Sequence, residues 1–146
     1  ASDDRIKKLV TWSAFADFGE IWQKYDVKKW QELGVSWSED RNTGIMLPLY
    51  YQNYQNYLDN KDQFDIKKAV ESLKIPMLAV HGIEDDQVAF ENALRLKKLN
   101  NNLEMSLMPN ANHNLGSYHP YKKTTLPFDT KIAIKDSVDF FKGKFV

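Results

Sequence analysis

Residues 75–88 read Ile-Pro-Met-Leu-Ala-Val-His-Gly-Ile-Glu-Asp-Asp-Gln-Val. Pro76 suits the first position of a strand, where its missing N–H is harmless, and the apolar run Met77–Val80 is typical of a parallel strand covered on both faces. The run ends at a glycine, and the carboxylates of residues 84–86 follow in a loop. From Gln87 to Leu99 the apolar residues recur at helical spacing. The stretch therefore predicts a buried strand, an acidic loop and a helix in succession.

A second predicted strand, Leu103–Met108, is followed by the loop Pro109-Asn110-Ala111-Asn112-His113. In open α/β sheets the functional groups lie at the carboxyl ends of the strands. Asp85 after one strand and His113 after the next are therefore expected at the same edge of the sheet. An acid followed by a histidine is also the order that closes the serine, acid and histidine sequence of α/β-hydrolases.

The segments His81–Val88 and Pro109–His113 resemble the acid and histidine loops of the α/β-hydrolase family, closest to its esterase and serine-peptidase-like members. Asp4–Val10 is similar to the strand that follows the nucleophile helix of that family. The resemblance implies that residues 1–146 form the C-terminal part of an α/β-hydrolase domain, with about three parallel strands and flanking helices. It also implies that Asp85 is the acid and His113 the base, and it implies no cofactor.

The nucleophile of that family is missing from this sequence. No Gly-x-Ser-x-Gly motif occurs, and the nearest string, Gly34-Val35-Ser36-Trp37-Ser38, lacks the second small residue. Family architecture implies a serine about one helix upstream of the first predicted strand, Ile6–Ala14, and therefore before residue 1. The outer edge of that strand would then be unpaired and prone to association. We therefore expect a partner there, either an N-terminal part of the same hydrolase as a second chain or another copy of this chain.

The segment from about 15 to 60 is longer than a crossover between parallel strands needs, and the resemblance implies a helical cap or lid there. Its spacing predicts helix from Phe18 to Leu33, stopped by Gly34. Residues 35–45 are polar and turn-like, and Pro48 is expected to open a second helix, Leu49–Leu58. Helical spacing makes the core of the cap the default interpretation for most aromatic residues of this segment. Three of them are candidates to line a substrate pocket: Trp22, Tyr50 and Tyr54.

Two helices are expected to flank the strands, Asp65–Leu73 with Asp65 as its N-cap and a C-terminal helix at about Asp129–Phe145. The expected buried residues of the C-terminal helix are Ile132, Ile134, Val138, Phe141 and Phe145.

The composition excludes several functions. Lys plus Arg and Asp plus Glu each number 20, so the formal net charge is zero, and no basic stripe indicates a nucleic acid or an anionic membrane as partner. No apolar run approaches the length of a membrane span. The absence of cysteine excludes disulfides and leaves the compartment open, with the cytoplasm favoured. His81 is expected to be a packed structural histidine and His119 a loop residue, and no short ligand spacing predicts a metal site.

Two interpretations from different classes follow. In the first, the chain is the C-terminal portion of a serine hydrolase that acts on a carboxylic ester or related acyl bond, and it is inactive alone. In the second, it is a non-catalytic α/β module that self-associates and binds a small molecule or a partner. Under the second interpretation Asp85 and Asp86 are only an acidic cluster at a helix N-terminus, which the helix dipole favours.

Overall fold

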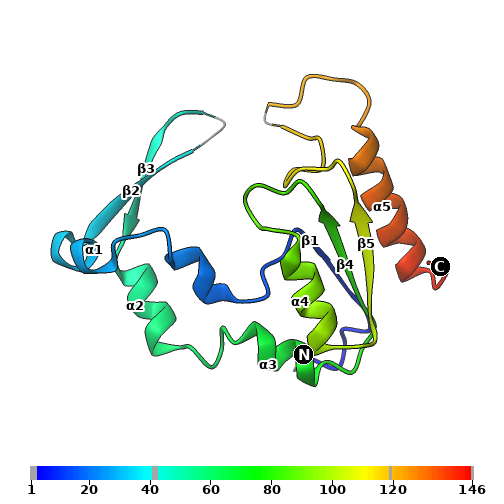
Figure 1. Ribbon diagram of the computed structural model, residues 1–146, viewed down its shortest axis with the longest axis horizontal. Helices are drawn as coiled ribbons and strands as arrows, with labels where there is room; N and C mark the ends of the chain where they lie inside the picture. The colour runs from blue at the N-terminus through cyan, green and yellow to red at the C-terminus, as the bar shows by residue number, and fades with distance from the viewer. Residues whose placement is uncertain (1–2, 41–42, 119, 146) are drawn as a thin grey trace. The chain divides into compact units, whose positions relative to one another are not determined.

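The computed structural model describes residues 3–40, 43–118 and 120–145, and the chain divides into two compact units. Unit 1 combines the N-terminal residues up to Ala16 with Lys67–Val146, and unit 2 is the intervening segment Asp17–Ile66. Unit 1 contains a three-stranded sheet and unit 2 a two-stranded one (Figure 1). The resemblance assigns a cap to about 15–60, and the boundaries of unit 2 lie within six residues of that segment.

The sheet of unit 1 consists of β1 (Leu9–Trp12), β4 (Met77–Gly82) and β5 (Leu103–Met108), all parallel, in the order β1-β4-β5. The expected three parallel strands are therefore confirmed. β1 is shorter than the expected Ile6–Ala14, because Ile6 is exposed and the backbone turns at Ser13, where φ is 47°.

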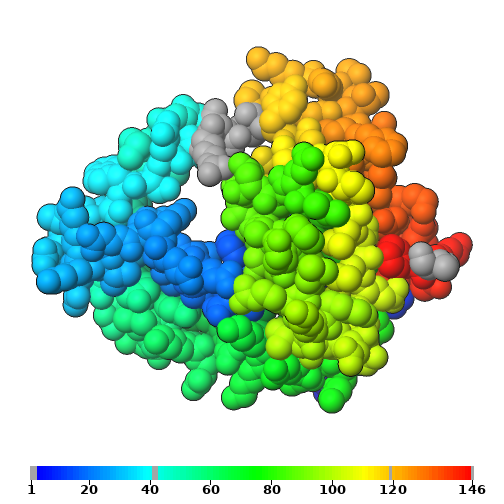
Figure 2. Space-filling model, viewed as in Figure 1, coloured from blue at the N-terminus to red at the C-terminus, as the bar shows by residue number. Residues whose placement is uncertain are grey.

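The central strand β4 is buried over its whole length. Its unbroken apolar run has this pattern because helices cover both faces of the sheet. Side chains alternate along a strand, so Leu78 and Val80 face one side and Met77 and Ala79 face the other. Helices α4 (Glu91–Leu99) and α5 (Phe128–Phe141) lie on opposite sides of the sheet (Figure 1), and α3 (Ile66–Ser72) leads into β4. Figure 2 shows the outer surfaces of α4, in yellow-green, and α5, in orange to red.

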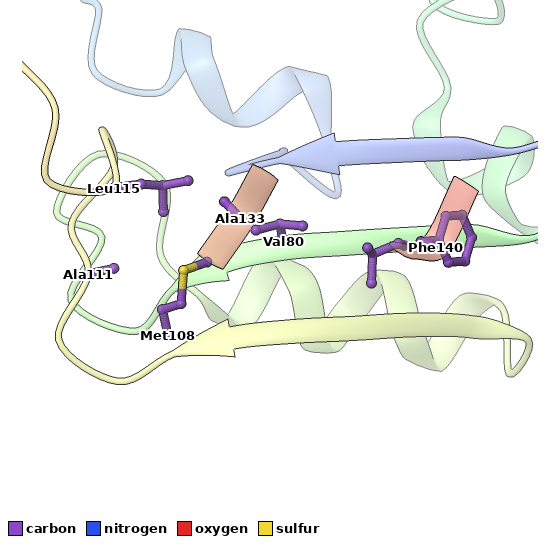
Figure 3. Close-up of a cluster of buried hydrophobic side chains, with 7 residues drawn as sticks. Val80, Met108, Ala111, Leu115, Ala133 and Phe140 are labelled. Carbon is purple, nitrogen blue, oxygen red and sulfur yellow. The ribbon is translucent and has the colours of Figure 1, made fainter. Parts of the chain in front are cut away.

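The core beneath α5 also includes the loop that carries His113. Figure 3 shows side chains from β4, β5, α5 and this loop meeting in one cluster. Its members are Leu78, Val80, Met108, Ala111, Leu115, Ala133 and Phe140. Burial of a large apolar side chain stabilises a fold by about 1.5–3 kcal/mol. Ala111 and Leu115, on either side of His113, therefore anchor that loop to the core.

The buried face of α5 differs in part from the expected one, although Ile132 and Phe145 are partly buried against the core as expected. Its buried residues are Thr130, Ala133, Ser137 and Phe140. The apolar stripe Ile134, Val138 and Phe141 is instead 39%, 40% and 54% exposed. The small side chains of Ala133 and Ser137 let the helix approach the sheet closely, whereas a stripe of large side chains would hold it further away. The helix also ends at Phe141, earlier than expected, because Gly143 takes a positive φ of 69°.

Unit 2 begins with a 3-10 helix η1 (Phe18–Trp22) and α1 (Val27–Leu33). Gly34 ends α1 in the left-handed conformation, φ 71°, as expected. The next two predictions were wrong. Val35–Glu39, expected within a polar turn, forms strand β2, and Met46–Tyr50, where Pro48 was expected to open a helix, forms strand β3 of the same antiparallel hairpin. Helix α2 (Gln52–Asp59) therefore begins four residues beyond Pro48 instead of at it.

Pro48 fits inside β3 for a reason of register. Tyr51 N–H donates to Gly34 C=O and Asp40 N–H to Ile45 C=O, both at 2.9 Å, so every second pair of the ladder is hydrogen-bonded. Pro48 lies opposite Trp37, between two such pairs, where its nitrogen faces away from the partner strand. A two-stranded ladder consists of edge strands alone, and it tolerates proline at such a position.

The core of unit 2 is aromatic. Trp30 is 2% exposed, and its Nε1–H donates to Leu49 C=O at 2.9 Å. Its ring lies 5.9 Å from that of Trp22 and 6.0 Å from that of Tyr54, between centroids. Aromatic contacts at this spacing add to the energy of burial. None of the described helices is both long and apolar enough to cross a membrane.

Candidate active site

The loops after β4 and β5 are joined directly at their bases. Ile83 N–H donates to Met108 C=O at 2.9 Å, and Glu84 N–H to Ala111 C=O at 3.1 Å. A Cβ atom at Gly82 would collide with the backbone carbonyl of Ala111, so only glycine permits this approach. The glycine of residues 75–88 thus does more than end a strand, because it allows the acid loop and the histidine loop to touch.

Asp85 is buried and held by backbone donors from its own loop. Its Oδ1 accepts hydrogen bonds from Gln87 N–H at 2.9 Å and Val88 N–H at 2.8 Å. Helix α4 begins only at Glu91. Asp85 therefore lies outside its first turn, and the interpretation of Asp85 as part of an acidic helix N-terminus was wrong.

His113 meets this carboxylate from the next loop. Its Nδ1 lies 2.9 Å from Asp85 Oδ2 and 3.1 Å from Asp85 Oδ1. The Asp85 side chain is fully buried, whereas that of His113 is 29% exposed. The structure therefore brings the two predicted residues together, with the acid inside and the histidine ring partly accessible.

The electrostatics of Asp85 decide which nitrogen of His113 is basic. Burial acts to raise the pKa of the Asp85 carboxyl, but the hydrogen bonds from Val88 N–H, Gln87 N–H and His113 outweigh it and hold that pKa below its ordinary value. The carboxylate is ionised at neutral pH and can only accept hydrogen bonds. His113 must therefore carry a proton on Nδ1, which leaves the lone pair of the neutral ring on Nε2.

A second histidine lies against the same carboxylate. His81 is 1% exposed, and its Nε2 lies 2.8 Å from Val88 C=O, so this nitrogen carries a proton. The same nitrogen is 3.2 Å from Asp85 Oδ2. The burial and the hydrogen bond match the expected structural histidine. Its proximity to Asp85 was not foreseen, although its spacing of four residues from Asp85 was visible in the sequence.

The histidine loop is tied down at several other points. Asn112 Oδ1 accepts hydrogen bonds from Asn114 N–H at 3.2 Å and Gly116 N–H at 3.1 Å. Thr130 Oγ1, at the start of α5, donates to Leu115 C=O at 2.7 Å. These contacts fix the backbone that carries His113 independently of its side chain.

The three candidate pocket residues belong to unit 2. Trp22 and Tyr54 pack against each other with ring centroids 5.7 Å apart, whereas Tyr50 is 55% exposed on β3. Ser36 lies within β2, opposite Leu49, and not at a strand-to-helix turn. His119 lies outside the described residues. Within the described ranges no group of three or more His, Cys, Asp or Glu side chains is placed to hold a metal ion.

A groove of about 700 Å³ lies elsewhere in unit 1, between β5 and α5. Residues 105–110 and one face of α5 line it, and neither Asp85 nor His113 does. Its size alone does not make it the site, because the paired acid and histidine lie outside it.

The parallel sheet, the flanking helices and the acid and histidine loops define the chain as part of an α/β-hydrolase. Residues 9–132 match the model of the prolyl oligopeptidase family, and the chain belongs to that family, which is one of serine hydrolases. No curated protein matches the sequence.

Several solved structures share the fold. Alpha/beta hydrolase domain-containing protein 10 from mouse is 14% identical with a TM-score of 0.66, and 96% of this chain and 54% of that one are covered. Est1E from Butyrivibrio proteoclasticus is 19% identical with a TM-score of 0.61, with 97% and 52% covered. The Pyrococcus horikoshii acylaminoacyl peptidase is 13% identical with a TM-score of 0.60, with 99% and 21% covered. The chain thus spans about half the length of the first two structures and a fifth of the third.

Proposed function

We propose that this chain supplies the acid and the base of a Ser-His-Asp triad that hydrolyses a carboxylic ester or a related acyl bond. The observation that carries the proposal is the 2.9 Å contact between His113 Nδ1 and the buried, ionised carboxylate of Asp85. The nucleophilic serine would lie on a segment outside these 146 residues, since no Gly-x-Ser-x-Gly motif occurs within them. The chain's share of about half the length of its structural neighbours supports that assignment.

Each residue has a definite part in this chemistry. His113 Nε2 would take the proton of the serine hydroxyl as the oxygen attacks the acyl carbon, and would then give that proton to the leaving group. Asp85 would keep the proton of the neutral ring on Nδ1 and stabilise the imidazolium that forms. A carboxylate already ionised and fixed by two backbone donors can do this without rearranging.

Unit 2 is the proposed cap, with its aromatic residues as the source of substrate contacts. Trp22 and Tyr54 lie within its core, so Tyr50, with its exposed ring, is the member of the predicted trio best suited to touch a ligand. The names of the neighbours include an esterase domain from Rhodothermus marinus and a peptidase, which supports an acyl bond without selecting the leaving group.

The remaining half of the hydrolase is the proposed partner. In the part of the chain that the structure describes, β1 pairs only with β4, so its outer edge is open. Trp12 on β1 is 43% exposed, and its Nε1–H donates to Ser137 Oγ of α5 at 3.0 Å. The exposed stripe of α5, defined here as Ile134, Val138 and Phe141, lies on that helix. An open strand edge next to uncovered apolar side chains is the surface that another part of the same sheet would cover.

Labelling with a fluorophosphonate, which reacts with activated serines, tests the proposal. Intact-mass spectrometry of the protein that carries this chain should show one phosphonyl adduct, and peptide mapping should locate it on a serine outside residues 1–146. Asp85→Asn should slow labelling by about 10⁴-fold, and His113→Ala by roughly 10⁶-fold. Glu84→Gln, an exposed carboxylate of the same loop, is the matched control and should label normally.

Three outcomes would count against the proposal. An adduct on Ser36 would make this chain the source of the nucleophile. Labelling that is unchanged in His113→Ala would show that His113 is not the base. No adduct at all, in a protein whose mass shows no further segment, would favour the non-catalytic module.

A further inference from the structure

Ser13, at the carboxyl end of β1, has an unusual backbone. Within residues 3–40, 43–118 and 120–145, the non-glycine residues with positive φ are Ser13, at 47°, and Leu115, at 51°. Side-chain-bearing residues avoid this region because Cβ approaches the backbone, and where they adopt it the surrounding structure must hold them there. Both residues adjoin His113, Leu115 in sequence and Ser13 in space.

The contacts of Ser13 show what it is held against. Its N–H donates to Val80 C=O at 2.9 Å, which extends the pairing of β1 with β4 by one bond. Its Oγ–H donates to His113 C=O at 3.2 Å, across 100 positions of sequence. Ser13 is 9% exposed, so the hydroxyl is largely shielded from water. The bend of the chain at Ser13 thus coincides with a hydrogen bond to the backbone of the proposed base.

We propose that Ser13 is a positioning residue for His113, an inference that rests on the proposed function of the Asp85 and His113 pair. Asp85 fixes the ring of His113 through Nδ1, and Ser13 fixes the carbonyl of the same residue. Thr130 holds the carbonyl of Leu115 two residues later. The ring and its backbone are therefore anchored separately, which limits the arc through which Nε2 can move. Displacement of a reacting group by about 1 Å can cost a hundredfold in rate.

Ser13→Gly separates positioning from simple stabilisation. Glycine adopts a positive φ without strain, so the loss of the hydrogen bond is offset by relief of the backbone. The thermal midpoint should stay within about 3 °C of the wild type, a shift that corresponds to a small change in stability. Ser13→Ala removes the same hydroxyl but keeps the strain, and should lower the midpoint further. Ser72→Ala is the matched control, since Ser72 Oγ also donates to a backbone carbonyl, that of Ala69 at 3.0 Å, outside the site.

The decisive readout is the proton NMR resonance of His113 Nδ1–H in the intact protein, measured in native conditions for each variant. We expect Ser13→Gly and Ser13→Ala to shift or broaden this resonance and Ser72→Ala to leave it unchanged. Where the protein hydrolyses an activated ester, kcat should also fall about tenfold in Ser13→Gly, equivalent to about 1.4 kcal/mol, with KM unchanged.

An unaltered His113 resonance in Ser13→Gly would overturn the proposal whether or not the midpoint falls, because a purely structural serine would change stability alone. Failure of the proposed function has a different signature. In that case the protein would show no fluorophosphonate adduct, while the resonance would still report on Ser13.

Discussion

At the scale of single residues, the polar contacts of the site converge on the side chain of Asp85. One oxygen accepts from two backbone N–H groups, and the other lies 2.9 Å from His113 Nδ1 and 3.2 Å from His81 Nε2. A buried carboxylate is costly unless such donors compensate for lost water. The donors of Asp85 come from its own loop and from the histidine loop, and His81 of β4 lies close by, so this side chain contacts three segments of unit 1.

This environment gives the stability of the protein a defined pH dependence. The folded-state pKa of Asp85 lies below its ordinary value of 3.8, so the unfolded chain binds a proton more readily. The stabilisation from Asp85 is therefore fully present above about pH 4 and is lost as the pH falls through the folded-state pKa. We expect the free energy of unfolding, measured by urea titration between about pH 2 and 6, to fall less steeply with acid in Asp85→Asn.

Glu84→Gln provides the comparison for that experiment, because Glu84 is exposed in the same loop. It should keep the slope of the wild type. Identical slopes in wild type and Asp85→Asn would show that the hydrogen bonds to Asp85 do not favour its ionised form.

At the scale of elements, α5 shows how packing can reverse a prediction from hydrophobicity. The stripe of Ile134, Val138 and Phe141 is the more apolar face, yet the face with Ala133 and Ser137 lies against the sheet. Close approach to β4 favours small side chains, and the position of Phe140 fixes the rotation of the helix about its axis. The stripe stays partly exposed in unit 1 and is therefore available to pack against another segment or another copy of the chain.

Val138→Glu tests the role of this stripe. Val138 is 40% exposed, so the change should alter the free energy of unfolding by no more than about 0.5 kcal/mol. If the stripe is covered by another segment or copy, the buried charge should weaken that association strongly. Sedimentation velocity would measure association and urea titration the stability.

Ala133→Glu serves as the contrasting variant, because Ala133 is 0% exposed and the new carboxylate would disrupt the core itself. Two results would show that the stripe is not part of the proposed interface. The wild-type protein could stay monomeric with no second segment, or the Val138→Glu variant could associate normally.

At the scale of the whole molecule, the two units have separate cores. Unit 1 is built around β4 and the aliphatic cluster of Figure 3, and unit 2 around Trp22, Trp30 and the tyrosines of α2. Segments unfold together when their side chains pack into one core, so two units with separate cores can unfold separately.

Trp30→Ala should therefore loosen unit 2 selectively. Removing a buried tryptophan costs about 3–5 kcal/mol, and here the hydrogen bond to Leu49 C=O is lost as well. In native-state hydrogen exchange, the amides of β2 and β3 should exchange faster while those of β4 and β5 keep their protection. Trp37→Ala, at a 57% exposed position of the same hairpin, should have little effect on either set. Equal loss of protection in β4 and β5 would mean that the two units unfold as one.

Local patterns of the sequence determined the parts of the fold that depend on neighbouring residues. The apolar run of β4, the strand β5, the stop of α1 at Gly34 and the two loops at one sheet edge were all predicted and are present. The pairing of Asp85 with His113 followed as well, because carboxyl ends of adjacent parallel strands must meet. The hairpin was missed because residues 35–45 carry turn-like composition and Pro48 indicated a helix start, whereas the pairing depends on a register that joins residues 7 to 15 positions apart.

Only the tertiary structure decided the contacts that join distant segments. These include the face of α5 turned toward the sheet, the approach of Gly82 to Ala111 and the bond from Ser13 to His113 across 100 positions. The physical reason is that periodicity reports which residues prefer burial but not which surface buries them. A choice between two nearly equivalent faces, or of a partner far along the chain, is made by close packing and by the need to pair every buried polar group.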